Sequence, residues 1–383
     1  MKPGHFDFID AVRGYAILGV IVVHVASWAP PTNGIALRLF EQGARGVQLF
    51  YVASAFTLLM SWRARNDGYL PFLVRRVFRI TPLIWLAIPV YLLFSGLGSG
   101  YVAPPADWTK SDVFRQMFYV DSFAPNSYSI VPGGWTVNTE MLFYLILPIF
   151  VVLIKTWRAA IVAYFISLIF AAKFAPRFEI FLISRFENIP PEMLAVWGAL
   201  SLPVQLPIFM SGFVVFYLMK EQILDKKEHR RILKLILVLS FCLMITFSFF
   251  RPITYGFWGV PLGILIFCFG RGVGGILINS AIVSLGKISF SAYIWHWLVL
   301  NFVSLDRDFG INIFGLGFEP SYVRFSILLV VVLSATSGVA FLSYQFIERP
   351  MIKIGGILAE RVAKKHRHNK QAGHPDHPAT GHS

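Results

Sequence analysis

The sequence has 383 residues, of which 56% are hydrophobic and only 14% charged, and its formal net charge is +14. Soluble domains carry about 25% charged residues, so this composition excludes a soluble globular protein. The apolar residues fall into runs of about 17–25, the length at which a helix crosses a bilayer.

These runs predict an all-α, polytopic membrane protein of about ten transmembrane helices. The predicted spans are residues 8–28, 46–62, 79–98, 136–154, 158–174, 202–219, 232–250, 254–270, 281–303 and 322–347. The run at 254–270 is the weakest, because Pro261 and several glycines interrupt it. Two short segments, 184–201 and 271–280, are candidates for re-entrant or interfacial structure.

The distribution of basic residues predicts how the chain is oriented. If the N-terminus is cytoplasmic, 23 of the 34 Lys and Arg residues fall in cytoplasmic segments and eight on the opposite side. This asymmetry is typical of a chain with an even number of spans and both termini in the cytoplasm. The positive charge therefore indicates membrane orientation and not nucleic-acid binding. Residues 1–350 are predicted to form one transmembrane domain, and residues 351–383 a basic, His-rich, disordered cytoplasmic tail.

The first span contains three ionisable residues, which are costly in lipid and usually face a protein interior. Arg13 and His24 are eleven residues apart, or three turns plus roughly 20°, so they share a helical face about 16 Å apart. Asp10 precedes Arg13 by one turn and can pair with it. In the predicted orientation Arg13 lies near the cytoplasmic boundary and His24 past the midplane. The alternative is that Arg13 snorkels to the headgroups and His24 sits in the outer interface.

A cluster of arginines is predicted in the loop between the second and third spans. Arg75 and Arg79, like Arg76 and Arg79, are one helical turn apart. Guanidinium groups bind phosphates through paired hydrogen bonds, so a phosphate-bearing cofactor is one candidate ligand. Anionic lipid headgroups are the other, and the spacing alone favours them.

The fourth predicted span begins with a group of polar and aromatic residues. Glu140 is followed one turn later by Tyr144, and Trp135 and Asn138 precede it. An acid near the outer mouth of a span, beside an amide and a phenol, suits binding of a polyol or general acid–base catalysis. A structural carboxylate favoured by the helix dipole explains the same pattern equally well.

The ninth span carries a polar stripe of Ser289, Tyr293 and His296, spaced at i, i+4 and i+7. For His296 a structural role is favoured over a chemical one. At the end of the tenth span, Glu348 and Arg349 are interpreted as the cytoplasmic end of the helix. No zinc signature or phosphate-binding loop is found, and Cys242 and Cys268 fall within spans, so no metal is expected.

Taken in order, these segments resemble the membrane acyltransferase-3 family, which includes O-antigen and exopolysaccharide O-acetyltransferases. The residues 8–14 followed by His24 are similar to the family's Arg-x10-His signature, and residues 46–56 to its second-span motif. Further similar segments are residues 75–82, 135–144, 289–296 and 344–350. Gln48 and Ala55 depart from the second-span motif, in which Asp and Gly are common.

The resemblance implies an enzyme of a bacterial-type inner membrane. It would transfer an acyl group, usually acetyl, from cytoplasmic acyl-CoA to a hydroxyl of an envelope glycan such as O-antigen or exopolysaccharide. His24 would be the general base or a transient acyl-imidazole nucleophile, and Glu140, the other expected catalytic residue, would with Tyr144 orient the acceptor or His24 from the outer side. The expected acyl-CoA-binding residues are Arg13, Arg75, Arg76 and Arg79. The expected acceptor-binding or supporting residues are Asp10, Trp135, Asn138, Tyr144, Ser289, Tyr293 and His296.

A membrane transporter or flippase of a glycan or acyl donor, working without chemistry, is the alternative function. Charges within the membrane fit it as well. The sequence lacks the clear two-fold repeat of hydropathy that is common in secondary transporters, which favours the enzyme.

Overall fold

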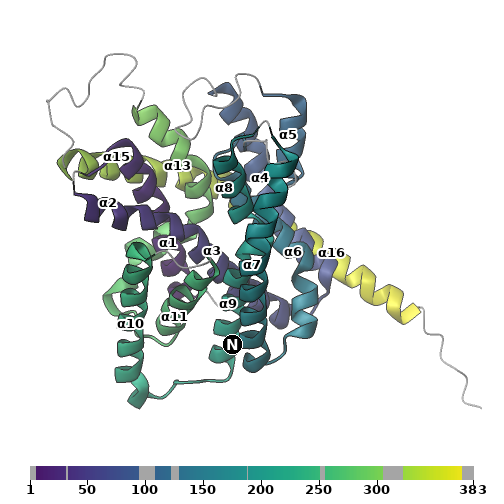
Figure 1. Cartoon of the computed structure of the whole chain (residues 1–383). Coiled ribbons are helices and arrows are strands. Elements are labelled where there is room, and N and C mark those ends of the chain that lie inside the picture. The colour runs from purple at the N-terminus through teal and green to yellow at the C-terminus, as the bar shows by residue number, and fades with distance from the viewer. Residues whose placement is uncertain are drawn as a thin grey trace, which may run out of the picture.

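The computed structural model describes residues 6–31, 33–94, 108–121, 129–187, 189–250, 255–304 and 322–372. All regular elements within these residues are helices, and they gather into one bundle (Figure 1). The longer helices are α1 (Asp7–Trp28), α3 (Gly46–Arg65), α4 (Tyr69–Leu93), α6 (Gly134–Leu153), α7 (Trp157–Arg185), α9 (Leu202–Lys220), α10 (Arg230–Phe249), α11 (Gly259–Gly270), α13 (Ser289–Ser304), α15 (Tyr322–Ser343) and α16 (Arg349–Ala372). The shorter ones are α2 (Gly34–Glu41), α5 (Lys110–Met117), α8 (Pro191–Leu200) and α12 (Ser280–Lys287).

The prediction of an all-α polytopic membrane protein is confirmed, although ten spans is only approximate. Within the described part of the chain, seven helical stretches are long and apolar enough to cross a membrane, or eight if a bent pair counts as one span. The seven are Asp7–Trp28, Tyr69–Leu93, Gly134–Leu153, Trp157–Arg185, Leu194–Lys220, Lys227–Phe249 and Tyr322–Lys365. The predicted spans 46–62 and 281–303 correspond to α3 and to α12 with α13, none of which is among the seven.

The predicted start of the third span differs from the observed start of α4, and this changes where the arginines lie. The connection between α3 and α4 is short, because Asn66 is left-handed with φ 46° and Gly68 has φ 96°. Consequently α4 begins at Tyr69 instead of near residue 79, and the predicted arginine-bearing loop is wrong. Arg75, Arg76 and Arg79 are helical residues of α4.

The weakest predicted span is a bent element. Tyr255–Gly270 and Gly275–Lys287 meet at 99°, so residues 271–274, the first part of the predicted re-entrant or interfacial segment 271–280, form the break. The side chain of Asn279 accepts a hydrogen bond from the backbone of Ile282 and starts α12, which ends before Ile288. The predicted span 281–303 is therefore two helices, and α13 begins afresh at Ser289.

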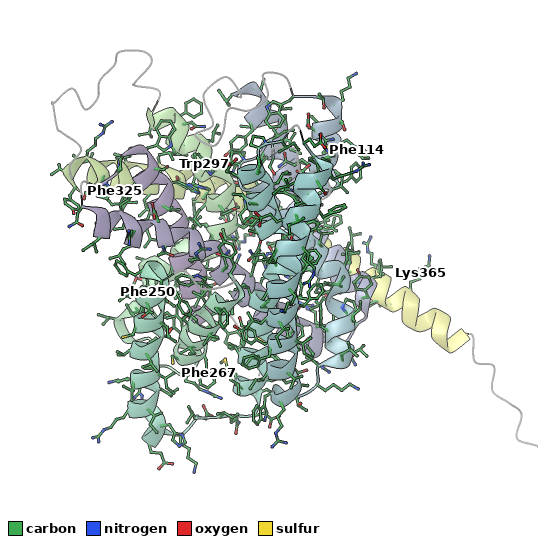
Figure 2. All side chains as sticks on the ribbon, viewed as in Figure 1. Phe114, Phe250, Phe267, Trp297, Phe325 and Lys365 are labelled. Atoms are coloured by element: carbon green, nitrogen blue, oxygen red, sulfur yellow. The ribbon has the colours of Figure 1, made fainter. Side chains whose placement is uncertain are left out.

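The predicted disorder of the tail is wrong for residues 351–372, which form α16 as far as Ala372. A π-helical turn, Tyr344–Glu348, joins α15 to α16. The first half of α16 packs on α4, where Gly355 lies against the Phe78 side chain. The helix then extends away from the bundle, with Lys365 on its outer part (Figures 1 and 2). The remaining tail residues, 373–383, are outside the described residues.

The first helix is at the centre of the bundle. It packs against α3, α12, α13 and α15. In its most apolar stretch 56% is buried within the protein, whereas 17% is buried in the corresponding stretch of the span that contains α10. The α1–α12 crossing is close, since a Cβ atom built on Gly286 would lie 1.7 Å from the backbone oxygen of Asp10. The polar residues of α1 therefore face protein, while the exposed apolar side chains of α10 suit contact with lipid.

Candidate active site

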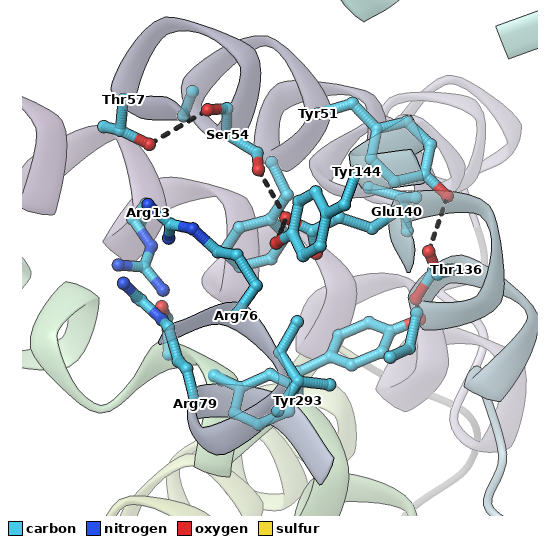
Figure 3. A pocket seen from close by; sticks show the side chains of 17 residues that line it. Arg13, Tyr51, Ser54, Thr57, Arg76, Arg79, Thr136, Glu140, Tyr144 and Tyr293 are labelled. Atoms are coloured by element: carbon cyan, nitrogen blue, oxygen red, sulfur yellow. Dashed lines mark hydrogen bonds between the residues drawn. The ribbon is translucent and has the colours of Figure 1, made fainter. Parts of the chain in front are cut away.

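A polar pocket lies where α1, α3, α4, α6 and α13 meet (Figure 3). It encloses about 740 Å³ of space not filled by atoms, part of it open to the surroundings. Seven of the residues singled out from the sequence line it, together with others from α3 and α6. Those seven are Arg13, Arg76, Arg79, Glu140, Tyr144, Ser289 and Tyr293.

Three guanidinium groups gather on one side of this pocket. Arg76 and Arg79 are one turn apart on α4, and Arg13 reaches the same space from α1 (Figure 3). The Arg76 guanidinium lies 5.5 Å from the ring centre of Phe72 and 6.0 Å from that of Tyr144, within the range of cation–π contacts. Its Nε atom is buried and has no hydrogen-bond partner among the described residues. Three cations this close are stabilised by an anion placed between them.

Among the described residues that line the pocket, Glu140 is the one carboxylate. Its Oε1 atom accepts hydrogen bonds from the Ser54 hydroxyl of α3 and, at 2.6 Å, from the Tyr144 hydroxyl one turn along α6. Tyr144 is 2% exposed, so its ring holds the carboxylate in a fixed position beside Arg76. A carboxylate fixed in this way can accept a proton or orient a polar ligand.

The N-terminus of α6 is tied to α13 at the far end of the pocket. The Tyr293 hydroxyl donates to the Gly133 backbone oxygen at 3.2 Å and lies 3.1 Å from the Thr136 hydroxyl. Gly133 has φ 79°, and a Cβ atom there would lie 2.5 Å from the Tyr293 hydroxyl. Only glycine fits both the backbone conformation and this contact.

A second polar group, the imidazole pair, consists of His24 on α1 and His296 on α13. Their ring centres are 5.3 Å apart and the ring planes differ by 24°. The Trp297 ring packs on His24 at 4.4 Å, and the Tyr293 ring centre is 5.6 Å from that of His296. Tyr293 thus contacts the imidazole pair and also lines the arginine pocket.

The remaining predicted site residues lie outside both groups. Arg75 forms a bidentate salt bridge with Asp67, at 2.7 and 2.8 Å. The Asn138 amide donates to Asp121 at 3.4 Å. Asp10 is buried at the α1–α12 crossing. Trp135 is half-buried against the hydrophobic core.

Several pocket residues were not predicted. Ser54 and Thr57 on α3, and Thr136 on α6, line it beside Glu140. Ser54 and Thr57 are three residues apart in the apolar stretch of α3, and this spacing could have indicated a polar face on that helix. Glu348, interpreted from the sequence as a helix end at the membrane surface, is instead 2% exposed and accepts a hydrogen bond from the Ser291 hydroxyl at 3.0 Å.

Residues 6–344 match a protein-family model described as an acyltransferase domain. The exopolysaccharide production protein ExoZ of Rhizobium meliloti is 27% identical over 329 residues, covering 82% of this chain and 92% of ExoZ. The O-acetyltransferase OatA of Staphylococcus aureus is 23% identical over 92% of this chain, and the putative peptidoglycan O-acetyltransferase YrhL of Bacillus subtilis 25% over 91%. The chain spans little more than half of these two proteins, 58% of OatA and 56% of YrhL. No solved structure gives a significant match.

Proposed function

The chain belongs to the membrane acyltransferase-3 family, and we propose that it is an O-acyltransferase that moves an acetyl group from cytoplasmic acyl-CoA to a hydroxyl of a cell-envelope glycan. In this proposal the protein lies in a bacterial inner membrane with both termini in the cytoplasm. The names of two relatives support this acceptor class, one an exopolysaccharide production protein and the other a putative peptidoglycan O-acetyltransferase.

The observation that carries the proposal is the arginine pocket within a family domain. Arg13, Arg76 and Arg79 face one carboxylate, Glu140, in the lining of the pocket. Acyl-CoA carries several phosphates, and arginine binds phosphate oxygens through two parallel hydrogen bonds. Arg75 is the weakest candidate for this task, because its guanidinium already has Asp67 as a partner on both terminal nitrogens.

The chemical step is assigned to the other end of α1. His24 lies three turns beyond Arg13, so a donor held by the arginines can direct its thioester along α1 toward the imidazole. The His24 imidazole would take the proton of the acceptor hydroxyl, or would first accept the acyl group itself. Glu140, fixed by Ser54 and Tyr144, would order the donor between the two groups.

Acceptor-dependent release of CoA tests the proposal directly. Purified protein in lipid nanodiscs would be incubated with labelled acetyl-CoA, with and without a range of envelope oligosaccharides. We expect label in the sugar and an equal amount of free CoA. Uptake of a glycan or donor into vesicles without transfer of label would contradict the enzyme and support a transporter.

A matched pair of arginine variants tests the donor site. Arg76→Gln removes one guanidinium from the pocket and is expected to raise the KM for acetyl-CoA by about 10- to 100-fold, the effect of losing one or two charge-assisted hydrogen bonds. Arg231→Gln removes an exposed arginine from α10 and should leave the KM unchanged. Equal KM values for the two variants would remove the arginine pocket from donor binding.

A further inference from the structure

His296 is held in one protonation form by its surroundings. Its Nδ1 atom is 2.7 Å from the backbone oxygen of Tyr293. A carbonyl oxygen only accepts hydrogen bonds, so Nδ1 carries the hydrogen and donates it. In the neutral ring the Nε2 atom then carries no hydrogen and has a lone pair that can accept one.

Burial supports the neutral form of this ring. His296 is 1% exposed, and its Nε2 atom has no hydrogen-bond partner among the described residues. A charged ring would place an N–H donor there without a protein acceptor, and burying an unpaired charged donor is costly. The resting ring is therefore neutral, and it can take a proton only from a group that comes within hydrogen-bond distance of Nε2 and then remains as the acceptor of the new N–H.

The ring next to this acceptor belongs to His24. Two imidazoles joined edge to edge by one N–H···N bond have their centres roughly 5 Å apart, from an N···N distance of about 2.9 Å and about 1.1 Å from each nitrogen to its ring centre. The observed ring centres are 5.3 Å apart, but the rings are stacked with planes 24° apart, and Nε2 of His296 has no hydrogen bond to His24 in this structure. His24 is half-buried whereas His296 is closed off, so a substrate meets His24 first. A proton can pass between the two rings only after the His24 ring turns until one of its nitrogens lies within hydrogen-bond distance of Nε2.

We propose that His296 is a positioning residue and proton acceptor that acts through His24, so that acyl transfer uses two imidazoles. This rests on the proposed function. The acceptor oxygen attacks the thioester carbonyl carbon, and its proton goes to one nitrogen of His24. The proton on the other nitrogen of His24 passes to Nε2 of His296. The C–S bond breaks, the sulfur leaves with the electron pair, and the proton returns through His24 to give the thiol. An ester and a thiol form, with no net change in protons.

Three substitutions at His296 separate this role from packing. Asn keeps an N–H near the position of Nδ1 for the Tyr293 carbonyl but has no basic nitrogen, Gln places an amide near Nε2, and Phe keeps only a ring. We expect each to lower kcat by about 10²-fold or more, the usual contribution of a positioned base, with an unchanged KM for acetyl-CoA. The control is His229→Asn, a histidine outside both polar groups, which should retain the wild-type kcat.

The number of protons transferred in the rate-limiting step can be measured from solvent isotope effects. A residue that only packs against His24 would not change this number. In mixtures of H₂O and D₂O, we expect kcat of the wild-type protein to depend on deuterium fraction with the curvature of two protons, and that of His296→Asn to be linear. Transfer by wild type and His296→Asn at equal rates with the same curve would overturn the relay and leave the acyltransferase standing. Absence of transfer by the wild-type protein would overturn both.

A measurement without turnover covers variants that do not fold. Nitrogen NMR of the histidine-labelled full chain in nanodiscs should show His296 neutral, with hydrogen on Nδ1 and none on Nε2. Loss of the His24 imidazole in His24→Ala should leave that form unchanged, because Tyr293 sets it. A hydrogen found on Nε2 of the resting protein would overturn the proposal whatever the activity.

Discussion

The arginine pocket and the imidazole pair are both built on α1 and α13, yet they are chemically opposite. The pocket gathers formal charges, with hydroxyls of α3 and α6 around its carboxylate. In the imidazole pair, the Trp297 ring packs on His24 and the Tyr293 ring lies beside His296, and neither of these two neighbours carries a charge. Charges suit the binding of a charged ligand, whereas neutral imidazoles suit proton transfer. The proposed function therefore divides binding and chemistry between two ends of one helix.

Substitution of His24 should give the largest effect of the variants considered, a loss of kcat without a change in donor KM. His24→Ala removes the imidazole without touching the pocket, so kcat should fall by about 10³-fold or more while the KM for acetyl-CoA stays within about two-fold. Steady-state release of CoA against donor concentration measures both. A His24→Ala enzyme that turns over at the wild-type rate would remove the chemical step from the imidazole pair.

Glu140→Gln should be the next largest effect and tests the boundary between the two regions. The amide keeps an oxygen to accept from Ser54 and Tyr144 but removes the negative charge beside Arg76. If Glu140 orders the donor for transfer, kcat should fall by about 10²-fold while donor affinity is retained or improved, because the pocket becomes more positive.

The control for Glu140 is an acid outside both regions. Glu228→Gln alters an exposed glutamate whose only described ion pair is with Lys226, so its kinetics should match the wild type. An unchanged kcat in Glu140→Gln would mean that this carboxylate has only a structural role, favoured by the dipole of its helix, which was the alternative interpretation of the sequence.

Much of the fold could be predicted from the sequence, because lipid imposes long apolar helices with few exceptions. The hydrophobic runs do not show where a helix bends or where it continues past its apolar part. The break before α12 and the early start of α4 at Tyr69 depend on turn geometry and on packing against neighbours. That is why the arginines of α4 were assigned to a loop.

The site could be predicted only as separate sets of residues, one from each helix. Spacing along α1 predicts that Arg13 and His24 share a face, and the cost of ionisable groups in lipid predicts that this face meets protein. Neither argument says which helices face the two residues. Glu140 was expected to orient the acceptor or His24 from the outer side, and the structure groups it with Arg13 and Arg76. His296 was judged structural, and its contact with His24 is visible only in three dimensions. Contacts between distant segments are set by tertiary packing, which periodicity does not encode.

A change at the crossing of α1 and α12 should act on both regions at once. A methyl group at Gly286 would overlap the backbone oxygen of Asp10, so Gly286→Ala must push the helices apart at a cost of about 1–3 kcal/mol. We expect a lower thermal midpoint together with a higher donor KM and a lower kcat. Gly338→Ala on α15, where no atom lies within 4 Å of the added Cβ, should leave all three unchanged or slightly raise the midpoint. Loss in only one region would mean that the two are held independently.

The smallest expected effect is a pH dependence of the thermal midpoint and of the donor KM. It should involve the arginine pocket and not the imidazole pair. Burial raises the pKa of Asp121, which lies outside the spans, to about 6 from 3.8, although the Asn138 amide and Arg115 partly oppose this. A raised pKa means that the protonated carboxyl stabilises the fold below about pH 4, and that this contribution is lost as the pH rises through 6. Asp112, which also acts on Asp121, has a lowered pKa because bonds from Thr109 and Arg115 outweigh its burial, so it titrates at lower pH.

Asp121→Asn isolates this group, because the amide stays neutral and can still accept from Asn138. Between pH 4 and 7 the wild-type thermal midpoint should decline by a few degrees relative to that of the variant, with the variant the more stable at pH 7. Since Asn138 is on α6, two residues before Glu140, the donor KM should follow the same pH range in the wild type and lose this dependence in the variant. The imidazole pair has no contact with Asp121 among the described residues, so the kcat ratio of wild type to variant at saturating donor should stay constant. A kcat ratio that changes through pH 6 would show that the two regions respond to pH as one site.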